Sequence, residues 1–375
     1  MKIIIGFDAS RCKSGGAYTH LLGILNIYNI KVFDELHIWT HSDMIEKLPR
    51  FGNIIYHTNN YINGNLIFQL AWQLLFLPKE LAKHRCEILV SLDASTVATY
   101  KKHIVLSRDM LSYEPGIMKL YPWYSKDRIR LEVILFIQNS AFRRADGVVF
   151  LTQYAASVIQ ESCGKLKNFR IIPHGISENF RNAHQIAISS KEKQTYRCMY
   201  ISNADLYKNQ WNVVEAISML RQRGYFISLD LIGGGDGPGM QLLLNSLTKF
   251  DPKGEFVSLR GKLNNRDLIE YYKKCDFFIY ASSCENMPNT LLEAITAGIP
   301  IVCSDRGPMP EVLNDAGLYF DPLSPVSISN AIMKIINSPQ LRLALANKSK
   351  MISSTFSWDK CSRETFSYIL EIIKN

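Results

Sequence analysis

Short apolar runs alternate with longer stretches of helical spacing along almost the whole chain. The short runs are rich in Val, Ile, Leu and Phe, which is typical of strands buried on both faces of a parallel sheet. The longer stretches carry apolar residues on one face, as helices packed on such a sheet do. The pattern therefore predicts an α/β fold of doubly wound parallel sheets. In the first half the predicted strands are residues 2–7, 35–40, 53–57, 88–91, 103–106, 147–151 and 169–172, and the predicted helices are residues 16–28, 66–83, 125–144 and 153–161.

The periodicity stops near residue 177 and starts again after residue 196. The stretch between them is polar, so we predict an interdomain linker at residues 181–196. It separates a first Rossmann-like domain, residues 1–180, from a second one, residues 197–356, and the chain ends in an amphipathic helix, residues 357–375, that crosses back to the first domain. We expect the domains to face each other across a cleft. In the second domain the predicted strands are residues 198–201, 228–232, 257–260, 277–280, 299–303 and 318–320, and the predicted helices are residues 210–223, 239–249, 264–274, 290–297, 309–314 and 324–336.

Composition and charge narrow the choice of partners. The 375 residues are 47% hydrophobic and 21% charged, which excludes a disordered or fibrous chain. The net charge is +9, and residues 1–180 carry 21 Lys and Arg against 15 Asp and Glu. This excess favours an anionic partner, which would be nucleic acid, a membrane surface or a phosphorylated small molecule. Because the basic residues form no known nucleic-acid-binding module, we expect no nucleic-acid partner.

The sequence predicts a cytoplasmic protein. No segment approaches the roughly 20 apolar residues of a membrane-spanning helix, and the first residues do not have the pattern of a signal peptide. The eight cysteines are scattered, with no Cys-x-x-Cys pair and no cluster with histidines, so we expect reduced thiols and neither disulfides nor a zinc site. Membrane contact is expected to be peripheral at most, on the inner face of the cytoplasmic membrane.

Residues 280–304 are the stretch of the sequence that is most informative about ligand binding. Here a predicted strand leads through a loop into a predicted helix. A helix N-terminus carries about +0.5 charge and binds anions, whereas the carboxylates of Glu285 and Glu293 suit hydroxyl groups. A nucleotide-sugar presents both kinds of group. Glu293 also has a structural interpretation, since it has the spacing of a capping box with Thr290, with Asn289 as a competing cap.

This stretch resembles the signature of retaining glycosyltransferase family 4, one of the families of glycosyl transferases group 1. The similar positions are Glu285, Pro288, Glu293 and the turn at residues 298–302. The resemblance implies the GT-B fold, in which two Rossmann-like domains face each other and the C-terminal one holds most of the nucleotide-sugar donor. It also places four loop residues in donor binding, namely Asn286, Met287, Pro288 and Asn289. The first two stand where the family usually has Gly and an aromatic residue.

The resemblance continues through the second domain. Residues 200–203 and 207–209 are similar to the donor-phosphate loop of the family, which ends in Lys followed by Gly or Asn, so Lys208 is expected to contact the phosphates and to be catalytic. Asn203 stands where many members have Arg and is expected to bind the donor. Lys262 follows a strand at the place where the family often contacts the nucleotide base. Residues 233–237 form a Gly-rich turn that is not a dinucleotide fingerprint, because Pro238 replaces the third glycine.

In the first domain the resemblance points to loops that follow strands. Gly15 and Gly16 match a Gly-Gly loop that faces donor and acceptor, and residues without a Cβ let the backbone approach a phosphate or sugar closely. Arg108 and Asp109 lie where many members carry a histidine, so Asp109 is expected to be catalytic and Arg108 to bind substrate. His174 matches a loop of the family and is expected to be a structural histidine.

The resemblance implies transfer of a sugar from a nucleotide diphosphate donor with retention at the anomeric carbon and without a metal or other cofactor. Lys208 and the helix start after Pro288 would stabilise the departing diphosphate. Glu293 would hydrogen-bond the ribose hydroxyls. Glu285 would act on the donor sugar, either as a nucleophile or by electrostatic stabilisation. Front-face attack, in which the leaving phosphate accepts the acceptor's proton, requires no protein base.

The expected acceptor is a glycan or a lipid-linked sugar of a surface polysaccharide, such as lipopolysaccharide O-antigen, capsule or exopolysaccharide. Basic residues lie beside the aromatic stretch 121–124 of the first domain, which favours an anionic bilayer or a lipid diphosphate there, although a solvated helix face explains them too. Two other functions remain open. One is a catalytically inactive nucleotide- or glycan-binding subunit, and the other is a nucleotide-sugar epimerase, for which no His/Glu pair is evident.

Overall fold

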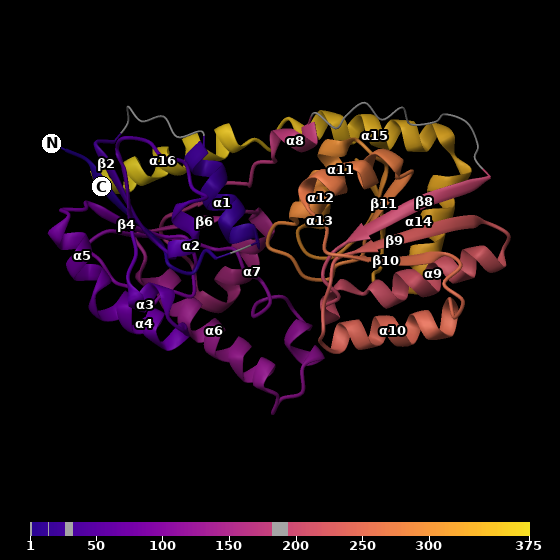
Figure 1. Cartoon of the computed structure of the whole chain (residues 1–375), viewed down its shortest axis with the longest axis horizontal. Helices are drawn as coiled ribbons and strands as arrows, with labels where there is room; N and C mark the ends of the chain where they lie inside the picture. The colour runs from indigo at the N-terminus through magenta and orange to yellow at the C-terminus, as the bar shows by residue number, and fades with distance from the viewer. Residues whose placement is uncertain (1, 14, 27–32, 182–193) are drawn as a thin grey trace. The chain divides into compact units, whose positions relative to one another are not determined.

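The chain folds into two compact α/β units. A computed structural model describes residues 2–13, 15–26, 33–181 and 194–375 (Figure 1). The first unit comprises Met1–Gly175 together with Ser357–Asn375, and the second comprises Ile176–Phe356. Among the described residues no helix combines the length and the apolarity needed to cross a membrane.

The first unit is built on a parallel sheet with the strand order β3-β2-β1-β4-β5-β6-β7. Its strands β1, β4, β5 and β6 are buried along their whole length, as their uninterrupted apolar runs predict. The order reverses between β1 and β4, so the sheet is doubly wound. The strands are β1 (Ile4–Ala9), β2 (Glu35–Thr40), β3 (Ile54–His57), β4 (Ile88–Ser91), β5 (His103–Leu106), β6 (Gly147–Phe150) and β7 (Phe169–Ile171).

Helices connect these strands, and one prediction for them is wrong. The helix predicted at residues 66–83 is two helices that meet at Phe76. Pro78 explains the break, because proline has no N–H to donate and its ring clashes with the carbonyl of the preceding turn. The helices are α1 (Gly15–Asn26), α2 (Ser42–Ile45), α3 (Asn60–Asn63), α4 (Leu66–Leu75), α5 (Leu77–Lys83), η2 (Ile117–Leu120), α6 (Lys126–Arg144) and α7 (Gln153–Cys163).

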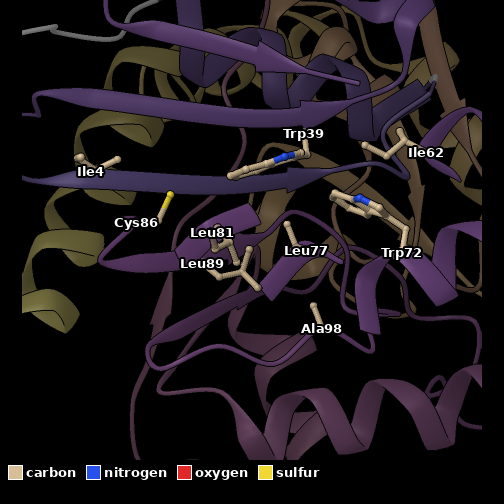
Figure 2. Packing of buried hydrophobic residues seen from close by; sticks show 9 residues of the cluster. All are labelled: Ile4, Trp39, Ile62, Trp72, Leu77, Leu81, Cys86, Leu89 and Ala98. Atoms are coloured by element: carbon tan, nitrogen blue, oxygen red, sulfur yellow. The ribbon is translucent and has the colours of Figure 1, made fainter. Parts of the chain in front are cut away.

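A cluster of nine buried side chains joins one face of this sheet to the helices that follow β3. Figure 2 shows the two indole rings of the cluster, Trp39 on β2 and Trp72 on α4, among smaller aliphatic side chains. Both indoles are about 1% exposed, so they account for much of the apolar surface buried here. The members are Ile4, Trp39, Ile62, Trp72, Leu77, Leu81, Cys86, Leu89 and Ala98.

The second unit repeats the architecture with the strand order β10-β9-β8-β11-β12-β13, which reverses between β8 and β11. All its strand pairs are parallel. The strand predicted to start at residue 198 begins at Thr195, inside the predicted linker, because residues 195–197 pair with β9. The strands are β8 (Thr195–Ile201), β9 (Phe226–Ile232), β10 (Val257–Gly261), β11 (Phe277–Tyr280), β12 (Ile301–Ser304) and β13 (Gly317–Phe320).

The helices of the second unit include three that the periodicity did not predict, the short α8 and η3 and the longer α15. Only α15 needs an explanation from packing. It packs against α12 and buries Arg342 and Ser349 beside Leu345 and Ala346, so polar residues on its inner face obscure the apolar pattern. The helices are α8 (Glu178–Arg181), η3 (Leu206–Lys208), α9 (Gln210–Gln222), α10 (Pro238–Phe250), α11 (Asn265–Lys274), α12 (Asn289–Ala297), α13 (Met309–Leu313), α14 (Pro325–Asn337) and α15 (Pro339–Ser353).

The boundary between the units lies at Gly175 and not at residue 180 as predicted. Phe180 on α8 packs its ring edge-on against Tyr272 at 5.8 Å, which assigns α8 to the second unit. Most of the predicted linker, residues 182–193, lies outside the described residues.

The last helix, α16 (Trp358–Lys374), belongs to the first unit, as its predicted return implies. It lies beside α1 in Figure 1, and the Ser362 hydroxyl donates a hydrogen bond to the Ile24 carbonyl at 2.9 Å. The loop before the helix passes so close to Gly175 that a Cβ there would lie 2.1 Å from the Trp358 amide nitrogen. A glycine is therefore required for α16 to dock.

We predict that Gly175→Ala lowers the free energy of unfolding by about 1–3 kcal/mol, because the added methyl must displace backbone rather than a flexible side chain. Urea unfolding followed by circular dichroism measures the change. Gly52→Ala is the matched control, since a Cβ at Gly52 meets nothing within 4 Å. Equal stability of the two variants would contradict the tight docking of α16.

Candidate functional site

The candidate site of the second unit lies where the strand order reverses, between β8 and β11. Lys208 ends η3, the short turn that follows β8, and Glu285 lies in the loop between β11 and α12. In doubly wound sheets, the connections that leave the carboxyl ends of the two strands at such a reversal run to opposite faces of the sheet. They leave room for a ligand between them. Two residues 77 positions apart in the sequence are thereby brought together.

Lys208 and Glu285 form an ion pair through Nζ and Oε1. Their side chains are only 11% and 14% exposed, so water screens the pair poorly. The Tyr280 hydroxyl donates a second hydrogen bond to the same Glu285 oxygen at 2.6 Å. The Lys208 ammonium also lies 4.8 Å from the centre of the Tyr207 ring, a cation–π distance. Both predicted catalytic residues of this unit therefore lie in one small, largely buried cluster.

Two tyrosines that the sequence interpretation did not identify position this pair. Tyr200 on β8 and Tyr280 on β11 are buried, and their ring centres lie 5.7 Å apart. The Tyr200 hydroxyl donates to the Lys208 carbonyl at 2.7 Å, while Tyr280 holds the Glu285 carboxylate. The detectable signal was a tyrosine near the end of each of two hydrophobic strands, where a hydroxyl requires a partner.

Asn209 locks the loop that carries Lys208. Its backbone is left-handed, with φ at +52°, a conformation that Asn and Gly adopt far more readily than other residues. Its side-chain amide donates to the Ala281 carbonyl at 2.9 Å and to the Ser283 hydroxyl at 2.7 Å. The Asn after Lys208 thus connects the loop after β8 to the loop after β11.

The Gly-rich segment after β9 supports the adjacent loop. Gly233 has a φ of +143°, and a Cβ there would lie 2.0 Å from the Ser202 carbonyl oxygen. The Ala204 amide donates to the Gly234 carbonyl at 2.8 Å. Lys262 is exposed, and its side chain passes close to Gly234. It lies at the carboxyl end of the parallel strands, as does the exposed Asn203.

The start of α12 differs from both predicted capping arrangements. The N-cap is Pro288, which offers no side-chain cap, and Asn289 is the first residue of the helix. The Thr290 hydroxyl donates to the Ile201 carbonyl at 3.2 Å, toward β8, instead of capping its own helix. Neither the capping box of Thr290 with Glu293 nor an Asn289 cap is present, because tertiary contacts engage Thr290. A helix start without a side-chain cap suits an anionic ligand.

Glu293 lies one turn into α12 and accepts a hydrogen bond from the Tyr272 hydroxyl at 3.3 Å. Burial of its carboxyl group raises its pKa to about 7, and the bond from Tyr272 offsets only part of this effect. Some of the side chain remains accessible. In the loop before α12, Asn286 and Met287 are buried, at 5% and 7% exposure, and Asn289 is partly exposed.

The predicted residues of the first unit also follow strands near a reversal point, which lies between β1 and β4. Gly15 and Gly16 come after β1, whereas Arg108 and Asp109 come after β5. Gly15 has a φ of +63° and open space where a Cβ would lie, and Gly16 is the next residue of α1. After β5, Arg108 Nη2 lies 3.8 Å from Asp93 Oδ2 in the loop after β4. Asp109 accepts a hydrogen bond from the Leu111 amide at 3.1 Å, and burial raises its pKa.

The first unit also contains a buried carboxylate, Asp8, that the sequence interpretation missed, and the histidine His174 that it named. Asp8 on β1 is buried and accepts hydrogen bonds from the Ser10 hydroxyl at 2.6 Å and from the Gln73 amide at 2.7 Å. His174 is also buried, with its Nδ1 at 2.9 Å from His20 Nδ1, and burial lowers its pKa to about 3. These contacts agree with a structural role for His174.

A cavity of about 230 Å³ in the second unit contains none of the predicted site residues. Arg260 and Asp230 form an ion pair at 2.6 Å in its wall. The cavity is lined by Arg197, Cys198, Met199, Asp230, Arg260, Glu270, Tyr271, Lys274 and Cys275.

Residues 182–351 match the protein-family model described as glycosyl transferases group 1. The chain is 26% identical over 167 residues to O-antigen chain mannosyltransferase B of Escherichia coli, covering 44% of each chain. It is 22% identical over 270 residues to N,N'-diacetylbacillosaminyl-diphospho-undecaprenol alpha-1,3-N-acetylgalactosaminyltransferase of Campylobacter jejuni, covering 68% of this chain and 69% of the relative. The chain spans about half the length of several curated relatives.

Solved structures of similar fold cover nearly the whole chain. Sucrose-phosphate synthase from Thermosynechococcus elongatus has a TM-score of 0.77 at 15% identity and full coverage of both chains. HepE of Anabaena in complex with UDP and glucose has a TM-score of 0.70 at 18% identity, covering 98% of this chain and 99% of that one. The predicted fold class, GT-B with two Rossmann-like units, is confirmed, as is the resemblance to glycosyl transferases group 1. Family 4 within that group remains a prediction.

We predict that Glu293 makes stability fall as the pH rises. Below about pH 4.5, its ordinary pKa, the carboxyl is protonated in both states, whereas between 4.5 and about 7 only the unfolded chain releases the proton. The free energy of unfolding therefore decreases through this window, by up to about 3 kcal/mol. Urea unfolding at pH 5 and pH 8 should show this loss reduced in Glu293→Gln. Glu364→Gln, which removes an exposed carboxylate, should keep the wild-type difference.

Proposed function

We propose that this chain is a retaining glycosyltransferase that moves a sugar from a nucleotide diphosphate sugar to a glycan or lipid-linked acceptor during surface polysaccharide synthesis. The observation that supports this most is the pair of Lys208 and Glu285 at the strand reversal beside the start of α12. A lysine ammonium and a helix N-terminus bind the negative charges of a diphosphate. The adjacent carboxylates of Glu285 and Glu293 accept hydrogen bonds from the hydroxyls of a sugar and a ribose.

The donor diphosphate binds Lys208 and the first N–H groups of α12. The ammonium group of Lys208 exchanges its ion pair with Glu285 for a phosphate, which carries more negative charge. A charge pair at 4 Å in an effective dielectric of about 20 is worth about 4 kcal/mol, an upper guide for one such contact. Asn203 and Lys262 lie on loops at the same edge of the sheet and contact the nucleotide. Fixed donors of this kind stabilise the charge that develops on the leaving diphosphate, and the reaction uses no metal.

The two carboxylates have different tasks. Glu285, held by Tyr280, faces the donor sugar and stabilises the positive charge that develops at the anomeric carbon. Glu293 accepts hydrogen bonds from the ribose hydroxyls, and its ionised form is the stronger acceptor. Because its pKa is about 7, donor binding strengthens as the pH rises through neutrality.

Transfer proceeds by front-face attack. The acceptor hydroxyl approaches the anomeric carbon from the side of the leaving group, a new glycosidic bond forms, and the bond to the diphosphate oxygen breaks. The diphosphate oxygen takes the hydroxyl proton, so the configuration is retained without a protein base. Gly15, Gly16, Arg108 and Asp109 of the first unit bind the acceptor, and Asp109, whose pKa burial raises, orients its hydroxyl.

The names of the relatives support this class of acceptor. One is named for an O-antigen chain and the other for a diphospho-undecaprenol-linked sugar, so both are consistent with a polysaccharide or lipid-linked substrate. The structural neighbour bound to UDP and glucose is consistent with a nucleotide-sugar donor.

We predict that Lys208→Ala and Glu285→Gln each lower kcat/KM for sugar transfer by about 100-fold or more, because each removes charge stabilisation at the reacting centre. The assay supplies UDP-, GDP- and ADP-sugars with a lipid-linked acceptor and follows the glycosylated product. Lys273→Ala is the matched control, since it opens an exposed ion pair with Glu270 in the same unit.

Three results would contradict the proposal. Near-normal transfer by either variant would remove the assigned roles. Donor binding without hydrolysis or transfer by the wild type would identify a binding subunit, and conversion of the donor into an isomeric nucleotide-sugar without acceptor would identify an epimerase. Thermal-shift screening of the three donor classes gives the binding readout.

We further propose peripheral contact of the first unit with an anionic bilayer on the cytoplasmic side. Ile129, Val133 and Phe136 form one exposed stripe along α6, with exposed fractions of 54%, 52% and 77%. Just before the helix, Trp123 and Tyr124 are 82% and 70% exposed. Exposed basic residues accompany this apolar surface, namely Lys119, Lys126 and Arg130. Apolar side chains flanked by cations are typical of interfacial helices.

We predict that the double substitution Trp123→Ala and Phe136→Ala reduces binding to phosphatidylglycerol vesicles at least about tenfold, because two exposed aromatic side chains that insert into the bilayer are lost. Sedimentation with vesicles measures the bound fraction. Phe226→Ala is the control, since Phe226 is 61% exposed in the second unit. Absence of wild-type binding to these vesicles would overturn the membrane proposal.

A further inference from the structure

Three histidines of the first unit converge near the edge of its sheet. His37 lies on β2, His57 ends β3, and His84 directly follows α5. Each offers a ring nitrogen, and these three atoms all lie within 4.8 Å of one another. None of the three belongs to the proposed sugar-transfer machinery.

The sheet and one helix end produce this convergence. Trp39 pairs with His57 in the parallel register, and His37 lies two residues before Trp39. The side chains of His37, Trp39 and His57 therefore share one face of the sheet. The rings of His37 and His57 are almost parallel, with centres 5.1 Å apart, and the ring of His84 lies 4.5 and 4.8 Å from them. The three imidazoles therefore form a compact triangle next to the Trp39 indole.

A carboxylate orients one of the rings, and a second carboxylate lies near another. His37 Nε2 lies 3.3 Å from Glu35 Oε2, and His84 Nε2 lies 3.6 Å from Glu80 Oε2. The Glu35 carboxylate accepts the N–H of His37 Nε2, which leaves the lone pair on His37 Nδ1. This nitrogen lies 2.8 Å from His57 Nε2. A carboxylate behind a histidine is the usual outer shell of a histidine metal ligand.

The surroundings favour the neutral form of His37 and His57. Burial lowers the pKa of His37 and, together with the other two histidines, lowers that of His57 to about 4. The charged groups that face the triangle include Glu35, Glu80 and Lys83. Neutral imidazole binds a metal through the ring nitrogen that carries no proton.

The geometry points to a binding site for a divalent transition metal, Zn²⁺ in particular, with His37, His57 and His84 as ligands. Tetrahedral Zn²⁺ with Zn–N bonds of 2.0–2.1 Å requires neighbouring nitrogens about 3.3 Å apart. The observed 2.8 Å contact must widen by about 0.5 Å, and His84 must approach. His57 and His84 are only partly buried, so rotation of their side chains allows this. A water molecule takes the fourth position, and the metal ties the edge strand β3 and the end of α5 to β2.

The test uses the whole 375-residue chain, stripped with a chelator and then titrated with ZnCl₂ or CoCl₂ alone. We expect one equivalent of Co²⁺ to give the visible absorption bands of a tetrahedral site, and saturating Zn²⁺ to raise Tm by about 3 °C or more. Absence of the bands and of the Tm shift at millimolar metal would overturn the site and leave the three rings as a packing cluster.

Substitutions separate this site from binding elsewhere. His57→Ala and His84→Ala should abolish the Co²⁺ bands and the Tm shift, and Glu35→Gln should weaken Zn²⁺ binding about tenfold or more by releasing His37. His41→Ala is the matched control, because His41 is a partly buried histidine of the same unit that lies outside the triangle, and it should respond like the wild type. An equal Tm shift in all variants would show that the metal binds at other residues and would overturn the proposal.

Discussion

The reversal of strand order between β8 and β11 is the constraint on which the candidate site depends. Parallel strands end at one edge of a sheet, and the connections from two neighbouring strands run to opposite faces only at such a reversal. The loops that carry Lys208 and Glu285 therefore start side by side and then diverge. If the two loops followed strands that are not neighbours in the sheet, Lys208 and Glu285 would not meet.

Hydrogen bonds from the strands convert this proximity into a defined geometry. Charges removed from water are costly unless they are paired and further hydrogen-bonded. Tyr280 supplies such a bond to Glu285, and Tyr200 and Asn209 hold the backbone on the Lys208 side. The pair thus rests on the core of the sheet and on adjacent loops, so its position is set before a ligand arrives.

The first unit has two separate groups of polar side chains, one near its strand reversal and one near its edge strand β3. Near the reversal, Asp8 lies at the end of β1, and Arg108 and Asp109 follow β5. At the edge, the three histidines lie next to Trp39, away from those residues in the strand order. The sequence prediction of no zinc site rested on the scattered cysteines, and His37, His57 and His84 have none of the spacings of known motifs. Only the pairing of β2 with β3 and the docking of α5 bring them together.

By itself the sequence determined the class of fold, every strand of both sheets, and the loops that contain the candidate residues, because apolar runs and strand–loop–helix transitions are local. It also indicated Lys208 and Glu285 through their resemblance to a known pattern. The tertiary structure decided what local spacing does not encode: the break at Phe76, the helix α15 with its buried Arg342, and the uncapped start of α12, where Thr290 bonds β8 instead. The tyrosines that hold the ion pair and the histidine triangle belong to the same class, since hydrogen bonds and ring contacts between distant residues exist only after the strands have paired.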